Sequence, residues 1–228
     1  MALSLAEVGF RVWLHYRTRA DAAREVAATI VERGGPQPVL TAFDLADRKA
    51  ADAAVGALID QNGPPDALVL NAGITHDGLF ALTSDREWDE ILDTNLGGLL
   101  AVGRPVVKAM VRVRAGRIVV VSSVASQIGN PGQVAYAASK GALNSAALSL
   151  ARELVTRGIT VNVVVPGLIE TEMVQRAPLE RLLPAIPAGR LGRPSEVAHV
   201  IRYFCSDESG CLTGQIVNVD GGMVPQPS

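Results

Sequence analysis

Short apolar runs alternate with longer helix-like segments along almost the whole chain, and this alternation constrains the fold more than any other feature. Runs such as residues 118–121 and 161–165 are rich in Val and Ile, which is typical of parallel strands buried on both faces. Repeated strand–helix–strand units with short connections predict an α/β fold, a Rossmann-like doubly wound parallel sheet covered by helices. We expect strands at residues 10–16, 38–42, 67–70, 117–121, 159–165 and 216–219, and helices at 19–33, 47–61, 85–112, 134–157 and 194–205.

The bulk properties point to one domain, residues 1–228, without a repeat or linker. A net charge of −2 and 4% aromatic residues argue against a nucleic-acid surface. No apolar run approaches the ~20 residues of a membrane span, and the start lacks the features of a signal peptide. We therefore expect a cytoplasmic protein with free thiols at Cys205 and Cys211. The three histidines are scattered, so no metal site is expected.

Ser123, Tyr136 and Lys140 form the pattern with the clearest chemical meaning. Tyr136 and Lys140 are four residues apart in an expected helix and therefore share one face. An ammonium near a phenol favours the phenolate, which predicts a lowered tyrosine pKa. Such a tyrosine can donate or accept a proton at cellular pH. Because Tyr-x3-Lys also arises by chance on helices, the neighbouring motifs must decide.

Other polar motifs follow expected strands, at the edge where open α/β sheets bind ligands. Asn71-Ala72-Gly73 is either a plain turn or a place where a ligand approaches the backbone. Asn95, inside a helix, is either a satisfied core residue or a group that holds a water. Pro166-Gly167 with Thr171 suits an amide-bearing ligand, and Asp220-Gly221-Gly222 is either a turn or part of a subunit contact.

In order and spacing, these motifs together resemble the short-chain dehydrogenase/reductase family over essentially the whole chain. Within the family, residues 129–136 and 158–173 are most similar to the 3-oxoacyl-(acyl-carrier-protein) reductases. The resemblance implies NADPH-dependent reduction of a 3-oxoacyl thioester, linked to acyl carrier protein, to the 3-hydroxyacyl thioester in fatty acid synthesis.

The resemblance also implies a role for each matching residue. Tyr136 would be the general acid that protonates the carbonyl oxygen, and Lys140 would lower its pKa and bind the nicotinamide ribose. Ser123 would hydrogen-bond the substrate carbonyl, and Asn95 would hold a water that resupplies protons through Lys140. The cofactor carries the hydride chemistry, while the protein positions and polarises.

The residues after the first expected strand bear on cofactor choice. Many NAD-binding folds place an Asp or Glu at the end of their second strand, which the first expected strand here matches, to bind the ribose 2′-OH. Here the chain has Arg17, whose guanidinium suits the 2′-phosphate of NADPH, although a solvated loop arginine is the plainer interpretation. The resemblance implies further cofactor contacts at Asp44, Leu45, Asn71, Ala72, Gly73, Tyr136, Lys140, Pro166, Gly167, Ile169 and Thr171.

The resemblance further implies partners. It implies a homotetramer with one interface formed by the helices at 85–112 and 134–157. Arg114 and Arg157 match basic residues near the site entrance that meet the acidic acyl carrier protein. Substrate specificity would lie largely in residues 169–189, whose sequence does not name a substrate.

One family feature has no counterpart in the 228 residues. Residues 1–8 match the later part of the family's first helix, and none of the 22 glycines forms the Thr-Gly-x3-Gly-x-Gly loop. That loop cradles the pyrophosphate, and with the first strand it makes up about 20 residues. The first strand lies in mid-sheet, so two neighbouring strands are expected to keep unpaired backbone groups. We expect either that Met1 is an internal methionine of a longer product, or that a truncated chain folds poorly and binds no dinucleotide.

Two other functions stay open. The Ser-Tyr-Lys machinery is common to short-chain reductases and dehydrogenases of other ketones and alcohols, including polyketide intermediates and sugars. The missing loop also allows a non-catalytic or inactive fold-mate, although Asn95, Ser123, Tyr136 and Lys140 argue against it.

Overall fold

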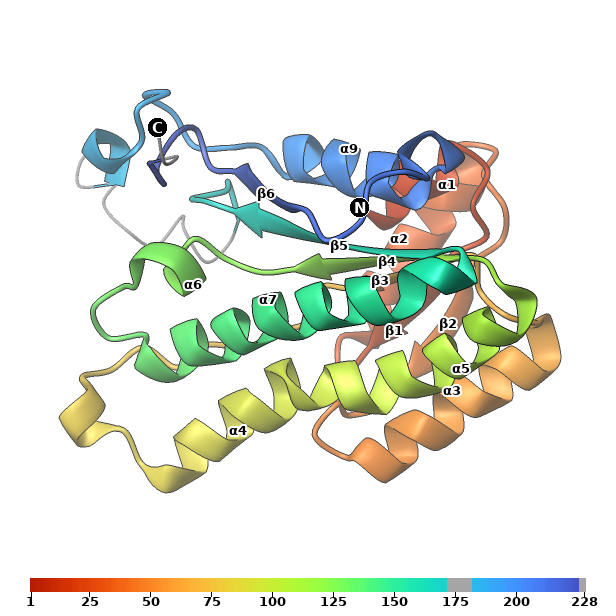
Figure 1. Cartoon of the computed structure of the whole chain (residues 1–228), viewed down its shortest axis with the longest axis horizontal. Coiled ribbons are helices and arrows are strands. Elements are labelled where there is room, and N and C mark those ends of the chain that lie inside the picture. Colours follow the sequence, from red (N-terminus) through yellow and green to blue (C-terminus); the bar gives the residue numbers. More distant parts are fainter. Residues whose placement is uncertain (172–181, 226–228) are drawn as a thin grey trace.

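The computed structural model describes residues 1–171 and 182–225, and it has three layers with helices on both faces of parallel strands (Figure 1). The expected α/β architecture is confirmed, with small differences at the ends of elements. The strands are β1 (Trp13–Tyr16), β2 (Val39–Ala42), β3 (Ala67–Leu70), β4 (Gly116–Val121), β5 (Ile159–Pro166) and β6 (Ile216–Val219). The helices are α1 (Ala2–Ala6), α2 (Ala20–Glu32), α3 (Arg48–Asn62), α4 (Asp85–Asn95), α5 (Arg104–Val113), α6 (Ala125–Ile128), α7 (Val134–Leu154) and α9 (Pro194–Cys205), with short 3-10 turns at Phe80–Leu82, Val155–Arg157, Leu183–Ala185 and Asp207–Ser209.

The centre of the larger sheet is β4 and β5, because their side chains are apolar on both faces. Successive side chains of a strand point to opposite faces. Ile118 and Val120 of β4 therefore pack in the core formed with α3, α5 and α7. Val119 and Val121 pack in the other core, formed with α1 and α9. An unbroken Val/Ile run thus requires helices on both sides of the sheet.

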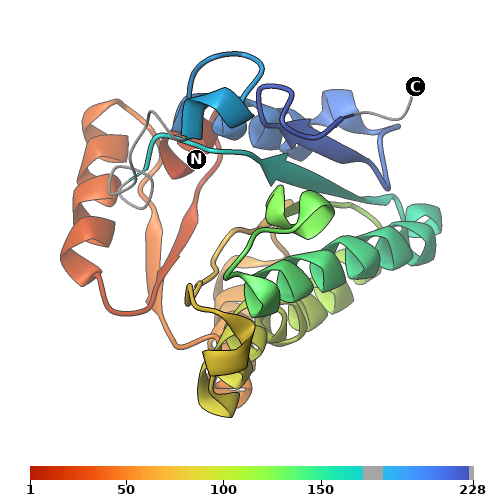
Figure 2. The same cartoon turned by 90° about the vertical axis from the view of Figure 1, so that its left-hand side faces the viewer.

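The parallel strands form two separate ladders. β1 pairs with β2, whereas β3, β4, β5 and β6 form the larger sheet in that order. No ladder joins β1 to β3 in the part of the chain that the structure describes. Figure 2 shows β1, β2 and α2 at one side of the molecule, apart from the larger sheet. The expectation that two neighbouring strands lack a partner is confirmed, and the gap falls between β1 and β3.

The long helix expected at residues 85–112 is interrupted in the middle. α4 begins with a capping box in which Ser84 and Glu87 bond each other's backbone N–H groups, and it ends at Asn95. A π-helical turn, Leu99–Gly103, then leads into α5. A Cβ at Gly98 would lie 3.4 Å from Leu45 Cδ2, so a glycine allows close packing there. The expected single helix is therefore interrupted just after Asn95.

Other expectations concern the thiols, membrane spans and metal sites. Cys205 and Cys211 are free thiols as expected, and burial raises the pKa of Cys205 to about 12. None of the described helices is long and apolar enough to cross a membrane. Within residues 1–171 and 182–225, no group of acidic, Cys and His side chains could hold a metal ion.

Candidate active site

The structure brings Ser123, Tyr136 and Lys140 together at the carboxyl edge of the larger sheet. Ser123 follows β4, and Tyr136 and Lys140 lie in the first two turns of α7, which packs along β5. The hydroxyl of Ser122 is buried and donates to the carbonyl oxygen of Lys140 at 3.3 Å. The hydroxyl of Ser123 accepts from Ala125 N–H at 3.3 Å and interacts with the Tyr136 phenol in the direction that lowers the pKa of Tyr136. Of the two serines, Ser123 is therefore the one available to a substrate.

Lys140 is almost completely buried, with 3% of its surface exposed. Burial lowers the pKa of its ammonium to about 8, because the charged form loses its hydration. The Nζ atom donates to the carbonyl oxygen of Val121 at 2.8 Å and lies 5.9 Å from the centre of the Tyr136 ring. A lysine has three hydrogens to donate, so this anchored group can also bond a ligand.

The pKa of Tyr136 is shifted in the direction opposite to the sequence prediction. Burial raises it, the hydrogen bond with Ser123 opposes this rise, and the Asp77 carboxylate raises it further. Lys140 directs its ammonium to the Val121 carbonyl and does not lower the tyrosine pKa in this arrangement. The predicted lowering is therefore wrong here, since desolvation of the phenolate outweighs the other effects. The phenol is protonated at neutral pH.

Asn95 connects the loop after β3 with helix α7. Its Nδ2 donates to Ile74 O and to Ser139 Oγ, both at 3.0 Å, and its Oδ1 accepts from Ile74 N–H at 2.7 Å. Ser139 Oγ in turn donates to Tyr136 O at 2.7 Å. These bonds make Asn95 a satisfied buried amide that holds the backbone around the site. Its implied role in holding a water stays a prediction.

Gly73 lets the loop after β3 approach the buried polar groups. A Cβ added there would lie 3.2 Å from Asn95 Oδ1 and 3.3 Å from Lys140 Nζ. Asn71, Ala72 and Gly73 are all exposed at the edge of the sheet. The backbone there is thus open beside a lysine, which suits the close approach of a flat ligand.

The loop after β5 packs against the turn after β6. Gly167 N–H donates to Val219 O at 3.0 Å, and a Cβ at Gly167 would lie 2.8 Å from Asp220 Cα. The carboxylate of Asp220 accepts from the N–H groups of Gly222 and Val224, both at 2.9 Å. Asp220-Gly221-Gly222 therefore forms a turn within this chain, and its part in a subunit contact stays a prediction.

Ile169 and Thr171 continue the loop away from Pro166-Gly167. Ile169 is buried and forms an isolated bridge with Gly192. Thr171 is exposed. Residues 172–181, in the segment expected to set specificity, lie outside the described residues.

The residues expected to contact the adenosine half of a cofactor lie on the two-stranded ladder. Arg17 follows β1 and is exposed. Asp44 follows β2 and is exposed, and its carboxylate accepts from Ala46 N–H at 2.9 Å. Leu45 is buried against Gly98. These residues and the Ser-Tyr-Lys group therefore belong to separate ladders.

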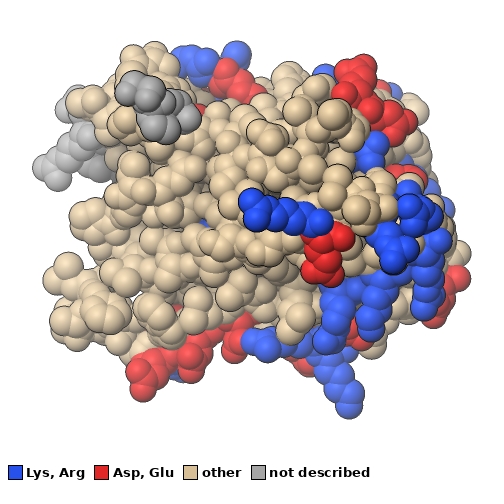
Figure 3. Space-filling view, in the orientation of Figure 1, with Lys and Arg blue, Asp and Glu red and all other residues tan. Residues whose placement is uncertain are grey.

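Arg114 and Arg157 lie at the edge of the sheet opposite to the Ser-Tyr-Lys group of the same chain. Arg114 ends α5 just before β4, and Arg157 precedes β5, so both lie at the amino ends of strands whose carboxyl ends carry the site. Arg114 Nη2 donates to Thr156 O at 2.9 Å, which joins the two segments. The amino ends of the strands lie on the right in Figure 1, and Figure 3 shows Lys and Arg gathered at that side. Within one chain these arginines do not border the Ser-Tyr-Lys group, and their contact with acyl carrier protein stays a prediction.

Sequence reasoning missed three residues that support the site. Gln133 Nε2 donates to Asp77 Oδ1 at 2.8 Å and thereby ties the loop after β3 to the start of α7. Ser139 bridges Asn95 and the Tyr136 backbone. Ser139 lies between Tyr136 and Lys140 in the sequence, so its position could have identified it as a residue of the site. Asp77 and Gln133 are far apart in the sequence and meet only through tertiary packing, so no sequence pattern pointed to them.

A comparison with protein families decides what kind of site this is. Residues 1–224 match a family model described as enoyl-(acyl carrier protein) reductase. The chain belongs to the short-chain dehydrogenase/reductase family. Membership implies a nicotinamide cofactor. The residues present fit the nicotinamide end of such a cofactor, since the open backbone at Gly73 lies beside the donor Lys140.

Individual relatives match over most of their lengths. The chain is 42% identical over 225 residues to the 3-oxoacyl-(acyl-carrier-protein) reductase FabG of Aggregatibacter actinomycetemcomitans, covering 98% of this chain and 93% of that protein. It is 38% identical over 224 residues to a 3-oxoacyl-(acyl-carrier-protein) reductase of Synechocystis, covering 98% and 90%. The FabG of Escherichia coli is 44% identical over 164 residues, which cover 71% of this chain and 67% of that protein.

Proposed function

We propose that the protein reduces 3-oxoacyl thioesters carried by acyl carrier protein to 3-hydroxyacyl thioesters in fatty acid synthesis, with NADPH as the reductant. The observation that carries this proposal is the Ser123–Tyr136–Lys140 group, assembled at the carboxyl edge of the sheet. The similarity to reductases of this name, over 98% of the chain, supports the substrate class.

Two hydroxyl groups are placed to act on a carbonyl oxygen. The interaction of Ser123 with the Tyr136 phenol places the two hydroxyls near each other, and we infer that one carbonyl oxygen can accept from both. When bound, NADPH supplies the hydride that goes to the carbonyl carbon. Tyr136 then gives its proton to the oxygen, which becomes the hydroxyl of the product. The raised pKa of Tyr136 keeps the phenol protonated, as a proton donor must be.

Lys140 and Asn95 hold this group in place. The Lys140 ammonium, anchored on Val121 O, would bond the nicotinamide ribose and stabilise the phenolate that remains after proton transfer. Asn95 fixes the loop that carries Gly73 and, through Ser139, the backbone at Tyr136. A water held near Asn95 would return a proton through Lys140.

The preference for NADPH is supported by the end of β1. Arg17 is exposed there, and no acid follows the strand before α2 begins. A guanidinium can bond a 2′-phosphate, whereas an acid would repel it.

A homotetramer is supported by apolar side chains on the expected interface helices. Val134 and Leu148 of α7 and Leu100 of the π turn are 46%, 38% and 46% exposed. Contact between copies would cover them. Light scattering of the purified protein tests the assembly state.

The function is tested by NADPH oxidation with acetoacetyl thioester, for the wild-type chain and for Tyr136→Phe. We expect turnover by the wild type and a loss of about 10²- to 10⁴-fold in the variant, because the phenol supplies the proton. The matched control is Tyr203→Phe, which alters an exposed tyrosine of α9 and is expected to keep full activity.

A second substrate discriminates between the two chemistries named by the comparisons. The family model is described by an enoyl reductase, whereas the relatives are named as 3-oxoacyl reductases. Two hydroxyl donors suit a carbonyl oxygen, so a trans-2-enoyl thioester should not be reduced. Faster turnover of the enoyl thioester, or equal activity of Tyr136→Phe, would refute the proposal.

A further inference from the structure

The residues just after Ser123 form α6, a helix of only four residues that lies beside the start of α7 (Figure 1). So short a helix has too few backbone hydrogen bonds to be stable alone, and its N-cap residue, Val124, makes no side-chain cap. The helix therefore depends on contacts with the rest of the fold. Val124 N–H donates to Pro166 O at the end of β5, at 3.1 Å, which ties α6 to the sheet.

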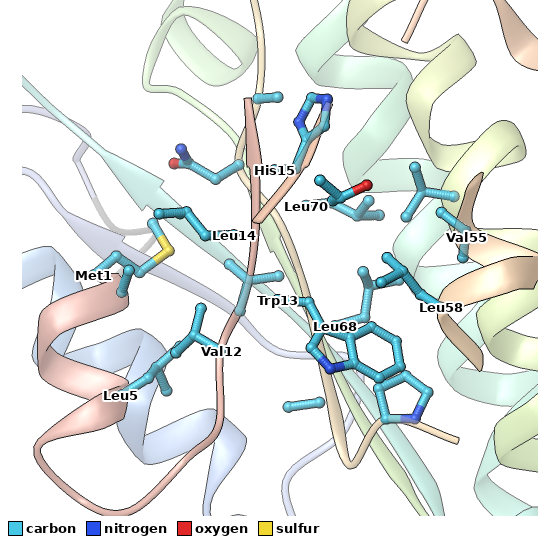
Figure 4. Close-up of a pocket in the computed structure, with 18 of the residues that line it drawn as sticks. Met1, Leu5, Val12, Trp13, Leu14, His15, Val55, Leu58, Leu68 and Leu70 are labelled. Atoms are coloured by element: carbon cyan, nitrogen blue, oxygen red, sulfur yellow. The ribbon is translucent and has the colours of Figure 1, made fainter. Parts of the chain in front are cut away.

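Asn144 of α7 ties α6 to the helix that carries Tyr136 and Lys140. It lies four residues after Lys140, so it shares that face of α7 one turn further on. Only 9% of its surface is exposed. Its Nδ2 donates to Ser126 Oγ of α6 at 2.9 Å, whereas its Oδ1 is buried without a hydrogen-bond partner among the described residues. The neighbouring Leu143 instead lines the large cavity between β1 and β3 (Figure 4).

An asparagine at this position does not serve the stability of α7. A buried amide oxygen without a partner lowers stability, and asparagine is a mediocre helix former. The neighbouring buried positions of the helix are Leu143, Ala147 and Ala151, which pack in the apolar core. A leucine in place of Asn144 would suit these surroundings better. The amide is therefore explained by the group that it bonds and not by packing.

The Ser126 hydroxyl uses its whole hydrogen-bonding capacity. It donates to Ser123 O at 2.6 Å, and it accepts from Asn144 Nδ2 at 2.9 Å and from Ser122 Oγ at 3.2 Å. A hydroxyl has one hydrogen and two lone pairs. Because the amide nitrogen of Asn144 can only donate, the Ser126 hydrogen must point elsewhere, and it goes to the backbone of Ser123.

The turn that carries Ser123 is closed by several bonds from the same few residues. Its carbonyl oxygen accepts from Ser126 N–H at 2.9 Å as well as from Ser126 Oγ, and its hydroxyl accepts from Ala125 N–H at 3.3 Å. Ser122, just before it, also donates to Lys140 O at 3.3 Å. The network around Ser126 thus links the backbones of Ser123 and Lys140, two residues of the Ser-Tyr-Lys group.

We propose that Asn144 and Ser126 are positioning residues for the reaction. Asn144 holds Ser126, and Ser126 holds the turn that directs the Ser123 hydroxyl to the substrate carbonyl. Both act through Ser123 and not on the substrate. The effect on turnover rests on the proposed function, whereas the effect on the turn does not. A displacement of about 1 Å can lower a rate by roughly 10²-fold, so a small movement of this turn is enough to be measured.

Asn144→Leu removes the amide and keeps the shape of the side chain. With acetoacetyl thioester and NADPH, we expect kcat to fall by about tenfold and the KM for NADPH to change by less than about twofold. The melting temperature should stay the same or rise, because the unpaired Oδ1 is gone. The matched control is Ser149→Ala, at an exposed residue of the same helix that bonds Ser145 O. A lower melting temperature with unchanged kcat would mark a merely structural amide and overturn the proposal.

Two variants of Ser126 test the link between the amide and the turn. Ser126→Ala should lower kcat to a similar extent, whereas Ser126→Thr keeps a hydroxyl and should restore most of the activity. Since both residues act through one chain of bonds, the double variant Asn144→Leu/Ser126→Ala should lose about tenfold and not about 100-fold. Multiplied losses, or equal activity of the two Ser126 variants, would overturn the proposal. If Asn144→Leu does not fold, the Ser126 variants still decide it.

Amide hydrogen exchange of the protein without substrate separates this inference from the proposed function. Peptides that span residues 122–129 should exchange about tenfold faster in Asn144→Leu than in the wild type, and at the wild-type rate in Ser149→Ala. If the wild type turns over no 3-oxoacyl thioester, the proposed function fails, and faster exchange in Asn144→Leu still supports the role of the amide in holding the turn. Unchanged exchange in Asn144→Leu would overturn the inference even for an active enzyme.

Discussion

The four-stranded sheet and the β1–β2 ladder are made from similar apolar residues but reach very different degrees of burial. Every residue of β5 before Pro166 is buried, whereas β1 and β2 contain no buried residue. β5 has a paired strand on each side and helices above and below, while β1 pairs only with β2 among the described strands. Burial of a strand thus depends on its neighbours in the sheet as much as on its own residues.

The residues of the proposed site are divided between the same two regions of the molecule. Ser123, Tyr136 and Lys140 are held by the larger sheet and α7. Arg17 and Asp44, the expected contacts of the adenosine half, lie on the smaller ladder. The larger sheet therefore holds the Ser-Tyr-Lys group in a complete core, whereas Arg17 and Asp44 lie on a ladder that a cavity of about 940 Å³ separates from β3.

The size of the cavity shows why this difference matters. At about 24 cal/mol per Å³, a dry void of 940 Å³ would cost on the order of 20 kcal/mol. That exceeds the ~5–15 kcal/mol by which a folded domain is normally stable. The cavity must therefore be filled by water or by an occupant when the chain is folded.

The largest expected effect comes from placing the same charge in each region. Val164→Asp buries an unpaired carboxylate in β5, where the wild-type residue has no exposed surface, and should destabilise by more than about 4 kcal/mol. Leu14→Asp puts the carboxylate at the cavity and should cost about 1 kcal/mol if water reaches it. Urea unfolding followed by circular dichroism measures both. Equal losses would show that the smaller ladder is as well packed as the larger sheet.

The next effect concerns the link between the loop after β3 and α7. Asn95→Ala leaves Ile74 N–H and O without partners and should reduce stability by about 1–3 kcal/mol. Turnover should fall by roughly 10- to 100-fold, because the site is misplaced. The control is Asn130→Ala, which removes an exposed bond to Gln133. Unchanged turnover in Asn95→Ala would separate this amide from the reaction.

A smaller effect is expected at the smaller ladder. Arg17→Ala should raise the KM for NADPH by about tenfold, equivalent to about 1.4 kcal/mol, and leave that for NADH unchanged. Steady-state kinetics with both cofactors measures this, with Arg24→Ala in α2 as the control. A parallel change for both cofactors would mean that Arg17 does not bind the 2′-phosphate.

The smallest effect is the pH dependence that Lys140 imposes on stability. The pKa of Lys140 is about 8 in the folded chain, whereas the ordinary value for a lysine is 10.5. Between these values the unfolded state binds more protons, so stability rises as the pH increases. Relative to Lys140→Met, the wild-type melting temperature should rise by roughly 2–4 °C between about pH 8 and 9. A difference that stays constant or falls would show that the ammonium is better solvated than its burial indicates.

Much of the fold and of the candidate site followed from local patterns. Unbroken Val/Ile runs located β4 and β5, because only strands covered on both faces have this composition. The spacing of Tyr136 and Lys140 placed them on one face of a helix. The interval from Ser123 to Tyr136 distinguished it from its neighbour Ser122, which the structure shows to be engaged with Lys140 O.

What the sequence could not supply depends on groups that meet across the fold. The pKa of Tyr136 was predicted with the wrong sign, because its burial and the position of Asp77 are not visible along the chain. The edge on which Arg114 and Arg157 lie depends on which ends of β4 and β5 they flank.

The sequence by itself determined the order of strands and helices, the two-faced burial of the central strands and the candidate site residues, since each depends on spacing along a regular element. The tertiary structure decided the charge state of those residues, the bonds that hold Asn95, and the cavity between β1 and β3. These properties arise from distances between segments remote in the chain, where desolvation and pairing across strand edges act.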